Sequence, residues 1–270
     1  ILPALEQRMA GWNVGAPLPA VPAPPSESPT GVFVVNKEDV NQTRVRMGHR
    51  SVTWDHPDAR AIQVMNDILG GGGFTSRITK RVRSDEGLAY SAGSGYGFGR
   101  DYPRTFVAVF QSKNESVAHA LTILGEEIRR IQAEPVSEEE LTTSINGFVD
   151  SFPSNFSSAG AKAGTFVSDE IRGRPLDYWK TYRDKLRAVT AADVQRVAQQ
   201  HLHPDKVTVL VVGKVDEVMA GDPDKPEYQL ENIAGPNGIM EIALPEPATL
   251  AYPHPPRPLV GKPQVEGMGS

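Results

Sequence analysis

The chain contains no cysteine among its 270 residues. Disulfide bonds, thiolate metal sites and a cysteine nucleophile are therefore excluded, although this absence does not decide the compartment. It also lacks any apolar run close to the roughly 18–20 residues that cross a bilayer, so no membrane span is expected. The chain also has no excess of basic residues. With a net charge of -5 it lacks the positive charge that binds phosphate backbones, so nucleic acid is excluded as a partner.

Familiar catalytic motifs are absent as well. Neither H-E-x-x-H nor H-x-x-E-H occurs, and G-x-S-x-G is missing. His201 and His203 form an H-x-H pair, but they fall at a predicted helix end before Pro204, where side chains two residues apart point in different directions. We therefore expect this chain to bind no metal. The alternative, an independent zinc enzyme using this pair, predicts about one zinc ion per isolated chain.

Prolines divide the chain into regions. Six of the 23 lie between Pro17 and Pro29, and ten lie from Pro223 onward. Residues 1–12 are interpreted as a short helix that ends a preceding domain, and 13–30 as an extended, semi-rigid linker. The main domain is expected over 31–218. Residues 219–270 are expected to be a mostly irregular tail, in which Ile239–Leu244 is the one predicted strand.

Alternating and helical periodicities predict the elements of the main domain. Apolar residues at helical spacing between Val117 and Ile131, and a capping box of Ser137 and Glu140, mark two helices clearly. The expected strands are 32–35, 43–48, 88–96, 105–111 and 206–213. One expected helix opens at Pro57 and ends at the glycine run that begins with Gly70. Further helices are expected over 76–85, 117–131, 137–152, 159–171, 176–186 and 191–201. This order predicts an α+β fold, with helices packed on one face of a largely antiparallel sheet.

Two features between Leu69 and Tyr90 are candidates for function. Gly70, Gly71, Gly72 and Gly73 form an uninterrupted run, which is typical of a mobile loop or of a close approach by another chain. It is not a phosphate loop, because no Gly-Lys-Ser/Thr follows.

Arg83 and Tyr90 are the second feature. They flank a turn at Gly87, so a guanidinium and a phenol could reach the same side of a cleft and hold a carbonyl oxygen as it gains charge. The alternative is a solvated arginine near a helix end and a tyrosine that fills a strand face.

The segment DILGGGGFTSRITKRVRSDEGLAYSAGSGY, Asp67–Tyr96, resembles the signature of the second, non-zinc half of insulinase/pitrilysin-type zinc metallopeptidases. The resemblance extends to Val40–Gln42, to the helix start at Ser137–Leu141 and to the strand VTVLVVG, and so spans about Gly31–Val218. It implies one half of a two-half clamp that closes around a peptide. The other half carries zinc on H-x-x-E-H, in the same polypeptide or in a separate subunit.

The resemblance also implies residue roles. Arg83 and Tyr90 match an Arg-x6-Tyr pair that reaches the substrate carbonyl. Gly70–Gly73 lies where related mitochondrial processing peptidase subunits carry a glycine-rich loop proposed to guide substrate. The sequence thus predicts the substrate-binding half of a zinc endopeptidase, inactive alone, with the bacterial envelope as the compartment that the family suggests. The alternative is a catalytically silent scaffold or peptide-binding subunit of the same fold.

Overall fold

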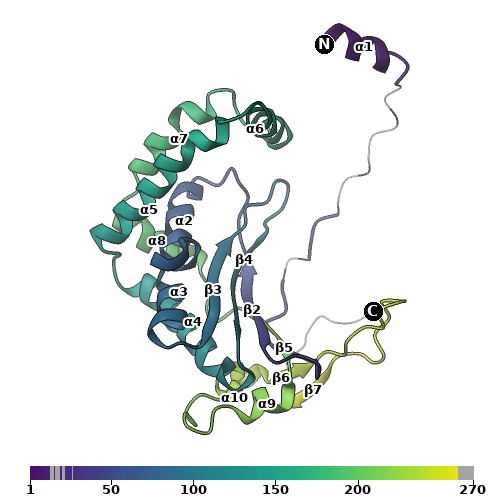
Figure 1. Ribbon diagram of the computed structural model, residues 1–270, viewed down its shortest axis with the longest axis vertical. Coiled ribbons are helices and arrows are strands. Elements are labelled where there is room, and N and C mark those ends of the chain that lie inside the picture. Colours follow the sequence, from purple (N-terminus) through teal and green to yellow (C-terminus); the bar gives the residue numbers. More distant parts are fainter. Residues whose placement is uncertain (13–14, 16–18, 20–21, 26, 261–270) are drawn as a thin grey trace.

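The structure is a computed structural model that describes residues 1–12, 15, 19, 22–25 and 27–260 (Figure 1). The predicted linker over 13–30 and the end of the predicted tail over 219–270 therefore lie partly outside the described residues. None of the helices in the described part of the chain has the length and apolar character that a membrane span needs.

Within the described residues, seven strands form one sheet in the order β3-β4-β2-β5-β1-β6-β7. The strands are β1 Gly31–Asn36, β2 Thr43–Arg50, β3 Ala89–Tyr96, β4 Thr105–Ser112, β5 Thr208–Gly213, β6 Ile239–Glu241 and β7 Arg257–Val260. Neighbours are antiparallel, except that β1 runs parallel to both β5 and β6. The sheet is mixed and mostly antiparallel, which confirms the predicted α+β class.

Side-chain alternation along the strands sets the two faces of the sheet. On β2, Val45 and Met47 are buried, whereas Arg44 and Arg46, which alternate with them, are exposed. Successive side chains of a strand point to opposite faces, so this pattern leaves one face open along β2. Phe106 on β4 and Val211 on β5 are fully buried on the covered face. That face forms the wall of the hydrophobic core.

Helices α2, α3, α4 and α8 cover that face (Figure 1). The helices of the described residues are α1 Leu2–Met9, α2 Ala59–Asn66, α3 Arg77–Thr79, α4 Val117–Ala133, α5 Glu138–Ser151, α6 Ala159–Arg172, α7 Tyr178–Arg187, α8 Ala191–His201, α9 Val215–Ala220 and α10 Leu230–Ala234. The apolar stripe from Val117 to Ile131 on α4 is buried as its periodicity predicts. Ser137 and Glu140 form the predicted capping box at the start of α5.

The two ends of the described chain differ in their contacts. No residue of α1 is buried, and α1 stands apart from the sheet in Figure 1. After β5, in contrast, the chain continues to pack on the domain. Leu230 of α10 and Ile239 of β6 are fully buried, and β6 and β7 extend the sheet beyond β1.

Candidate functional site

The glycine run lies in helical turns that pack against strand β3. Helix α2 continues as a π-helical segment, η1, over Asp67–Gly71, and a 3₁₀ turn, η2, follows over Gly73–Thr75. A Cβ on Gly70 would lie 2.5 Å from the backbone nitrogen of Ser94 on β3. Gly73 has a φ of +64°, which favours glycine. Glycine is therefore needed at Gly70, where the chain passes close to β3, and at Gly73, where the backbone is left-handed. The π-helical segment η1 is a further sign of function, because such segments are frequent at functional sites.

A second π-helical segment, η3 (Lys80–Asp85), continues α3 and carries Arg83. Ile78 and Val82 are fully buried on the core side of this helix, because residues four apart lie on the same face. The hydroxyl of Thr79 donates to the carbonyl of Ala92 on β3, at 2.8 Å. These contacts fix the helix against the strand that carries Tyr90.

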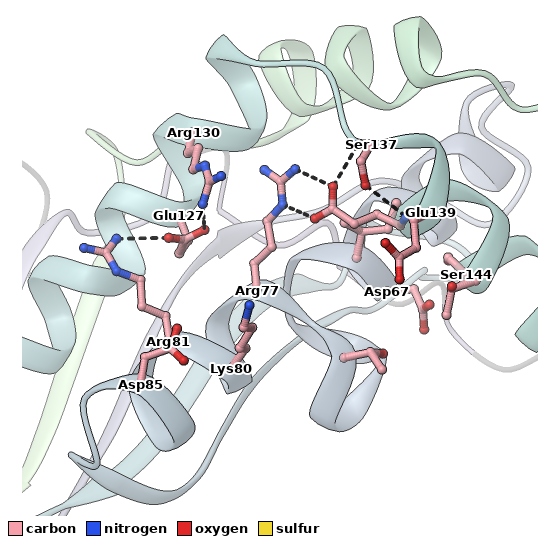
Figure 2. Close-up of a pocket in the computed structure, with 14 residues that line it drawn as sticks. Asp67, Arg77, Lys80, Arg81, Asp85, Glu127, Arg130, Ser137, Glu139 and Ser144 are labelled. Carbon is pink, nitrogen blue, oxygen red and sulfur yellow. Dashed lines mark hydrogen bonds and ion pairs between the residues drawn. The ribbon is translucent and has the colours of Figure 1, made fainter.

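Ion pairs hold the other side of the same helix, around a cavity of about 530 Å³ (Figure 2). Nε and Nη2 of Arg77 donate to the two carboxylate oxygens of Glu140, at 2.6 and 2.9 Å. Nη1 of Arg81 donates to buried Glu127 at 2.9 Å. The Arg77 guanidinium lowers the pKa of Glu140 to about 2, and burial raises the pKa of nearby Asp67. Helix α3–η3 is thus tied to α4 and α5.

Tyr90 owes its orientation to an irregularity of the strand. It is the second residue of β3, and a β-bulge shifts the register between Ala89 and Ser91, which pair with Ser112 and Gln111. Counting back from Ser91 by strict alternation would place residue 90 on the helix-covered face. The bulge removes that constraint, and Tyr90 is 82% exposed. Strand β3 is also an edge of the sheet.

Arg83 and Tyr90 come together as neighbours. Gly87, with a φ of +63°, turns the chain between η3 and β3. The Cζ atom of Arg83 lies 5.1 Å from the centroid of the Tyr90 ring and 4.4 Å from that of Phe74. Phe74 follows the glycine run directly and is 70% exposed, so the end of the glycine run and Tyr90 both lie beside the guanidinium of Arg83.

Both donors are available. Among the described residues, the side chains of Arg83 and Tyr90 have no hydrogen-bond or ion-pair partner; their contacts are the ring contacts given above. The pair thus presents a guanidinium and a phenol to the surroundings, which can donate to an anionic or developing oxyanion oxygen. Phe74 had no signal in the sequence beyond following the glycines.

The residues near Arg83 do not suit a zinc ion. The chain lacks H-x-x-E-H, and in the described residues the one grouping of histidine and carboxylate side chains with the spacing of a metal site is His56, Asp58 and His201. The ring of His203, the sequence partner of His201, instead lies against that of His49, with centroids 5.0 Å apart and the planes tilted by 56°. Zinc chemistry of the H-x-x-E-H kind has no ligands in this chain.

The peptidase M16 inactive domain matches residues 1–148, more than half of the chain. The chain belongs to this family. M16 is the insulinase/pitrilysin family, so the resemblance of Asp67–Tyr96 is confirmed. A crystal structure of a peptidase M16 inactive domain from Pseudomonas fluorescens shares the fold, with a TM-score of 0.66 and 23% identity. The match covers 74% of this chain and 47% of that one.

Two curated relatives of this M16 domain carry contrasting names. The "Non-peptidase homolog YmxG" of Helicobacter pylori is 21% identical over 155 residues, which are 57% of this chain and 35% of the relative. The "Uncharacterized zinc protease YmxG" of Bacillus subtilis is 24% identical over 170 residues, 61% of this chain and 39% of the relative. The M16 domain described here therefore spans less than half the length of these relatives, which include proteins named as protease and as non-peptidase.

Proposed function

We propose that this M16 domain is the substrate-binding half of a zinc endopeptidase, in which Arg83 and Tyr90 donate hydrogen bonds to the oxygen of the scissile carbonyl. The observation that supports this role is the contact between the two side chains. A permanently charged guanidinium and an exposed phenol lie side by side, and their donors are not used inside the domain. Such donors act most strongly on charge that develops in the transition state.

The glycine run takes a supporting part in this proposal. Gly70–Gly73 leads directly to Phe74, whose exposed ring lies over Arg83. In this proposal, a peptide bound at the guanidinium lies close to this ring. We assign to the run the role of shaping the approach to Arg83, because small residues let another backbone come close.

The complementary half supplies what this chain lacks. The zinc ion, its H-x-x-E-H ligands and the activated water belong to that half in our proposal, upstream in the same polypeptide or in a separate subunit. The length of the relatives supports such a partner, since this chain covers 39% of the Bacillus protein. The exposed apolar residues Leu2, Leu5 and Met9 of α1 are further support, because an apolar face on an unburied helix is suited to packing on another unit.

The decisive experiment compares two tyrosine variants in the protein assembled with its complementary half. Tyr90→Phe should lower kcat for a peptide substrate by about 100- to 1,000-fold while zinc content is unchanged. Tyr96→Phe removes a hydroxyl from the other end of the same strand, about 20 Å away, and should leave kcat unchanged. Equal turnover of Tyr90→Phe and the unmodified protein would remove Tyr90 from the mechanism.

A catalytically silent scaffold or peptide-binding subunit is the second candidate, and the name of the Helicobacter relative favours it. The two candidates differ in the complementary half. An intact H-x-x-E-H there supports the peptidase, and a degenerate motif supports the scaffold. No peptide hydrolysis by the assembled protein with intact zinc ligands would also favour the scaffold.

A further inference from the structure

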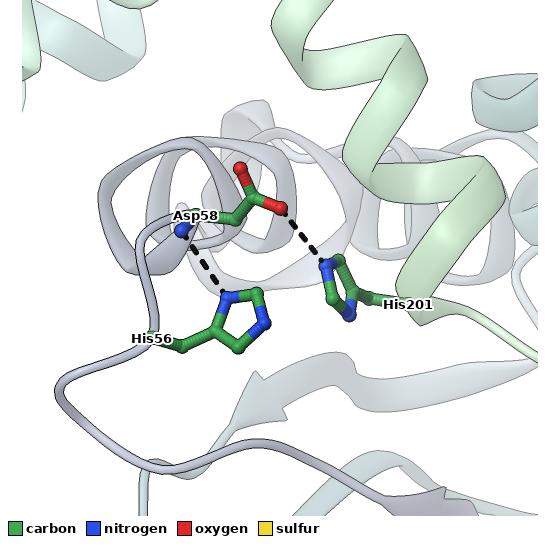
Figure 3. Close-up of side chains that lie close together, drawn as sticks. All are labelled: His56, Asp58 and His201. Carbon is green, nitrogen blue, oxygen red and sulfur yellow. Dashed lines mark hydrogen bonds and ion pairs between the residues drawn. The ribbon is translucent and has the colours of Figure 1, made fainter.

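Three side chains that are far apart in the sequence meet where helix α2 begins and helix α8 ends. His56 lies in the turn before α2, Asp58 is the residue that precedes its first turn, and His201 is the last residue of α8. Figure 3 shows the three side chains turned toward one another. One ring nitrogen of each histidine and one carboxylate oxygen of Asp58 lie within 4.8 Å of one another.

The distances are close to those of a coordination shell. Zinc bonds of 2.0–2.2 Å to nitrogen and oxygen in a tetrahedral site place the ligand atoms about 3.3 Å apart. Nε2 of His201 lies 3.2 Å from Oδ2 of Asp58, which already has this spacing. The rings of His56 and His201 meet edge to face, with centroids 5.0 Å apart. Because the ligand atoms lie within 4.8 Å of one another, an ion would draw the His56 ring inward by at most roughly 1.5 Å.

The surroundings fix the carboxylate of Asp58. Nη2 of Arg196 donates to Oδ1 of Asp58 at 2.8 Å, whereas Oδ2 faces His201, and a bound ion would replace the hydrogen bond between Oδ2 and Nε2 of His201. Second-shell hydrogen bonds of this kind orient metal ligands. All three candidate ligands are partly buried, so an ion can enter from solvent and water can complete its shell.

His56 is held only weakly in its present orientation. The backbone N–H of Asp58 donates to Nδ1 of its ring at 3.2 Å, at the long end of the normal range. Coordination of an ion requires the His56 ring to give up this hydrogen bond, either to the ion or by rotating away from it. The turn that carries His56 lies outside helix α2, so the ring can move without disturbing the helix.

From this geometry we propose that His56, Asp58 and His201 form a three-ligand site for a divalent transition metal ion of the zinc type. Two imidazoles and one carboxylate are a ligand set that zinc accepts, and they would disfavour magnesium, which prefers oxygen ligands. The ion would tie the turn before α2 to the end of α8. The site differs from the family's H-x-x-E-H zinc in its residues, and all three ligands come from this chain.

The site is also remote from Arg83 and Tyr90. The turn with His56 follows the Arg50 end of β2, which pairs with Thr105 at the start of β4. Ala89, next to Tyr90, pairs with Ser112 at the other end of β4. The proposed ion therefore stabilises the helical layer and takes no direct part in the chemistry proposed for Arg83. The proposal stands independently of the peptidase function.

The test is zinc binding to the full chain after removal of bound metal. Calorimetry with zinc chloride alone should show one site per chain, magnesium should give no signal, and cobalt(II) should produce the visible absorption of a low-symmetry site. His56→Ala and His201→Ala should each weaken zinc binding by about tenfold or more, since even second-shell losses cost 10- to 100-fold. His203→Ala is the matched control and should bind zinc like the unmodified protein.

Thermal unfolding keeps the test decisive if His201→Ala folds poorly. Saturating zinc should raise the Tm of the unmodified protein and of His203→Ala but not that of His56→Ala, whose residue lies in a turn. The proposal is overturned if the unmodified chain binds no zinc, or if His203→Ala loses as much affinity as His56→Ala. The second result would mean that zinc binds adventitiously to scattered histidines.

Discussion

The guanidinium of Arg77 forms a bidentate ion pair with the carboxylate of Glu140, with Nε 2.6 Å from Oε1 and Nη2 2.9 Å from Oε2. The same carboxylate accepts the backbone N–H of Ser137 at 2.8 Å and so completes the capping box of α5. Glu140 therefore caps the start of α5 and also binds α3, the helix that continues into the segment with Arg83. Side chains in this pair are only 9% and 29% exposed.

This pair makes the stability of the domain depend on pH. Because the pKa of folded Glu140 falls to about 2 from an ordinary value of 4.5, its contribution is complete above about pH 4.5 and is lost as the pH falls toward 2. Glu140→Gln should lower the free energy of unfolding at pH 7 by about 1–3 kcal/mol, and the difference from the unmodified domain should shrink below pH 4.5. Urea unfolding at several pH values measures it.

Glu138→Gln, in the exposed first turn of the same helix, is the control for that measurement. It should change the free energy of unfolding by less than about 1 kcal/mol at pH 7. A difference for Glu140→Gln that stays constant from pH 7 to pH 2 would contradict the role of the ion pair.

Gly70→Ala should destabilise the domain. Its Cβ would lie 2.5 Å from the backbone nitrogen of Ser94, and strand β3 cannot yield without breaking its pairing with β4. Overpacking of this kind costs about 1–3 kcal/mol. Gly164→Ala is the matched substitution, because its Cβ meets nothing within 4 Å in helix α6, and it should stabilise by up to about 1 kcal/mol. Denaturant unfolding that ranks the two variants in the opposite order would refute the close approach.

Gly87→Ala tests the turn between Arg83 and Tyr90. A Cβ there meets nothing within 4 Å, so the cost comes from the φ of +63° alone and should be about 1–2 kcal/mol. If the turn aligns the two side chains, kcat of the assembled protein should fall more than stability alone explains. Gly87→Asn, which tolerates this backbone conformation better, should recover most of both losses.

Phe74→Ala should remove the ring contact that orients the Arg83 guanidinium, without unfolding the domain. The ring is 70% exposed and lies 4.4 Å from the guanidinium carbon, and such a contact contributes about 0.5–1 kcal/mol at an exposed position. Within the proposed peptidase, kcat/KM should fall by about two- to fivefold, with Tm nearly unchanged. Phe166→Ala, similarly exposed on α6, should change neither quantity.

Local patterns were enough to predict most elements of the domain. The apolar repeat of α4 and the Ser137–Glu140 capping box act within a few residues, so the sequence displays them directly. The adjacent placement of Arg83 and Tyr90 also follows from local features, a helix end, Gly87 and the start of a strand.

Contacts between distant segments could not be predicted in the same way. The parallel pairing of β1 with β5 and β6 depends on tertiary packing, as do the contact of Gly70 with Ser94 and the stacking of Phe74 on Arg83. The sequence pairs His201 with His203, two residues away, whereas in space His201 meets His56 and Asp58. Periodicity reports which face of an element is buried but not which partner covers it.

The position of β5 between β2 and β1 has a consequence for biosynthesis. Strand β1 pairs only with β5 and β6 among the described residues, so it has no partner in this sheet until residues 208–213 have been synthesised. Non-local pairing of this kind slows folding. A nascent chain that stops at residue 148, where the family match ends, would expose the edges of β1 and β2 and invite chaperone binding or aggregation.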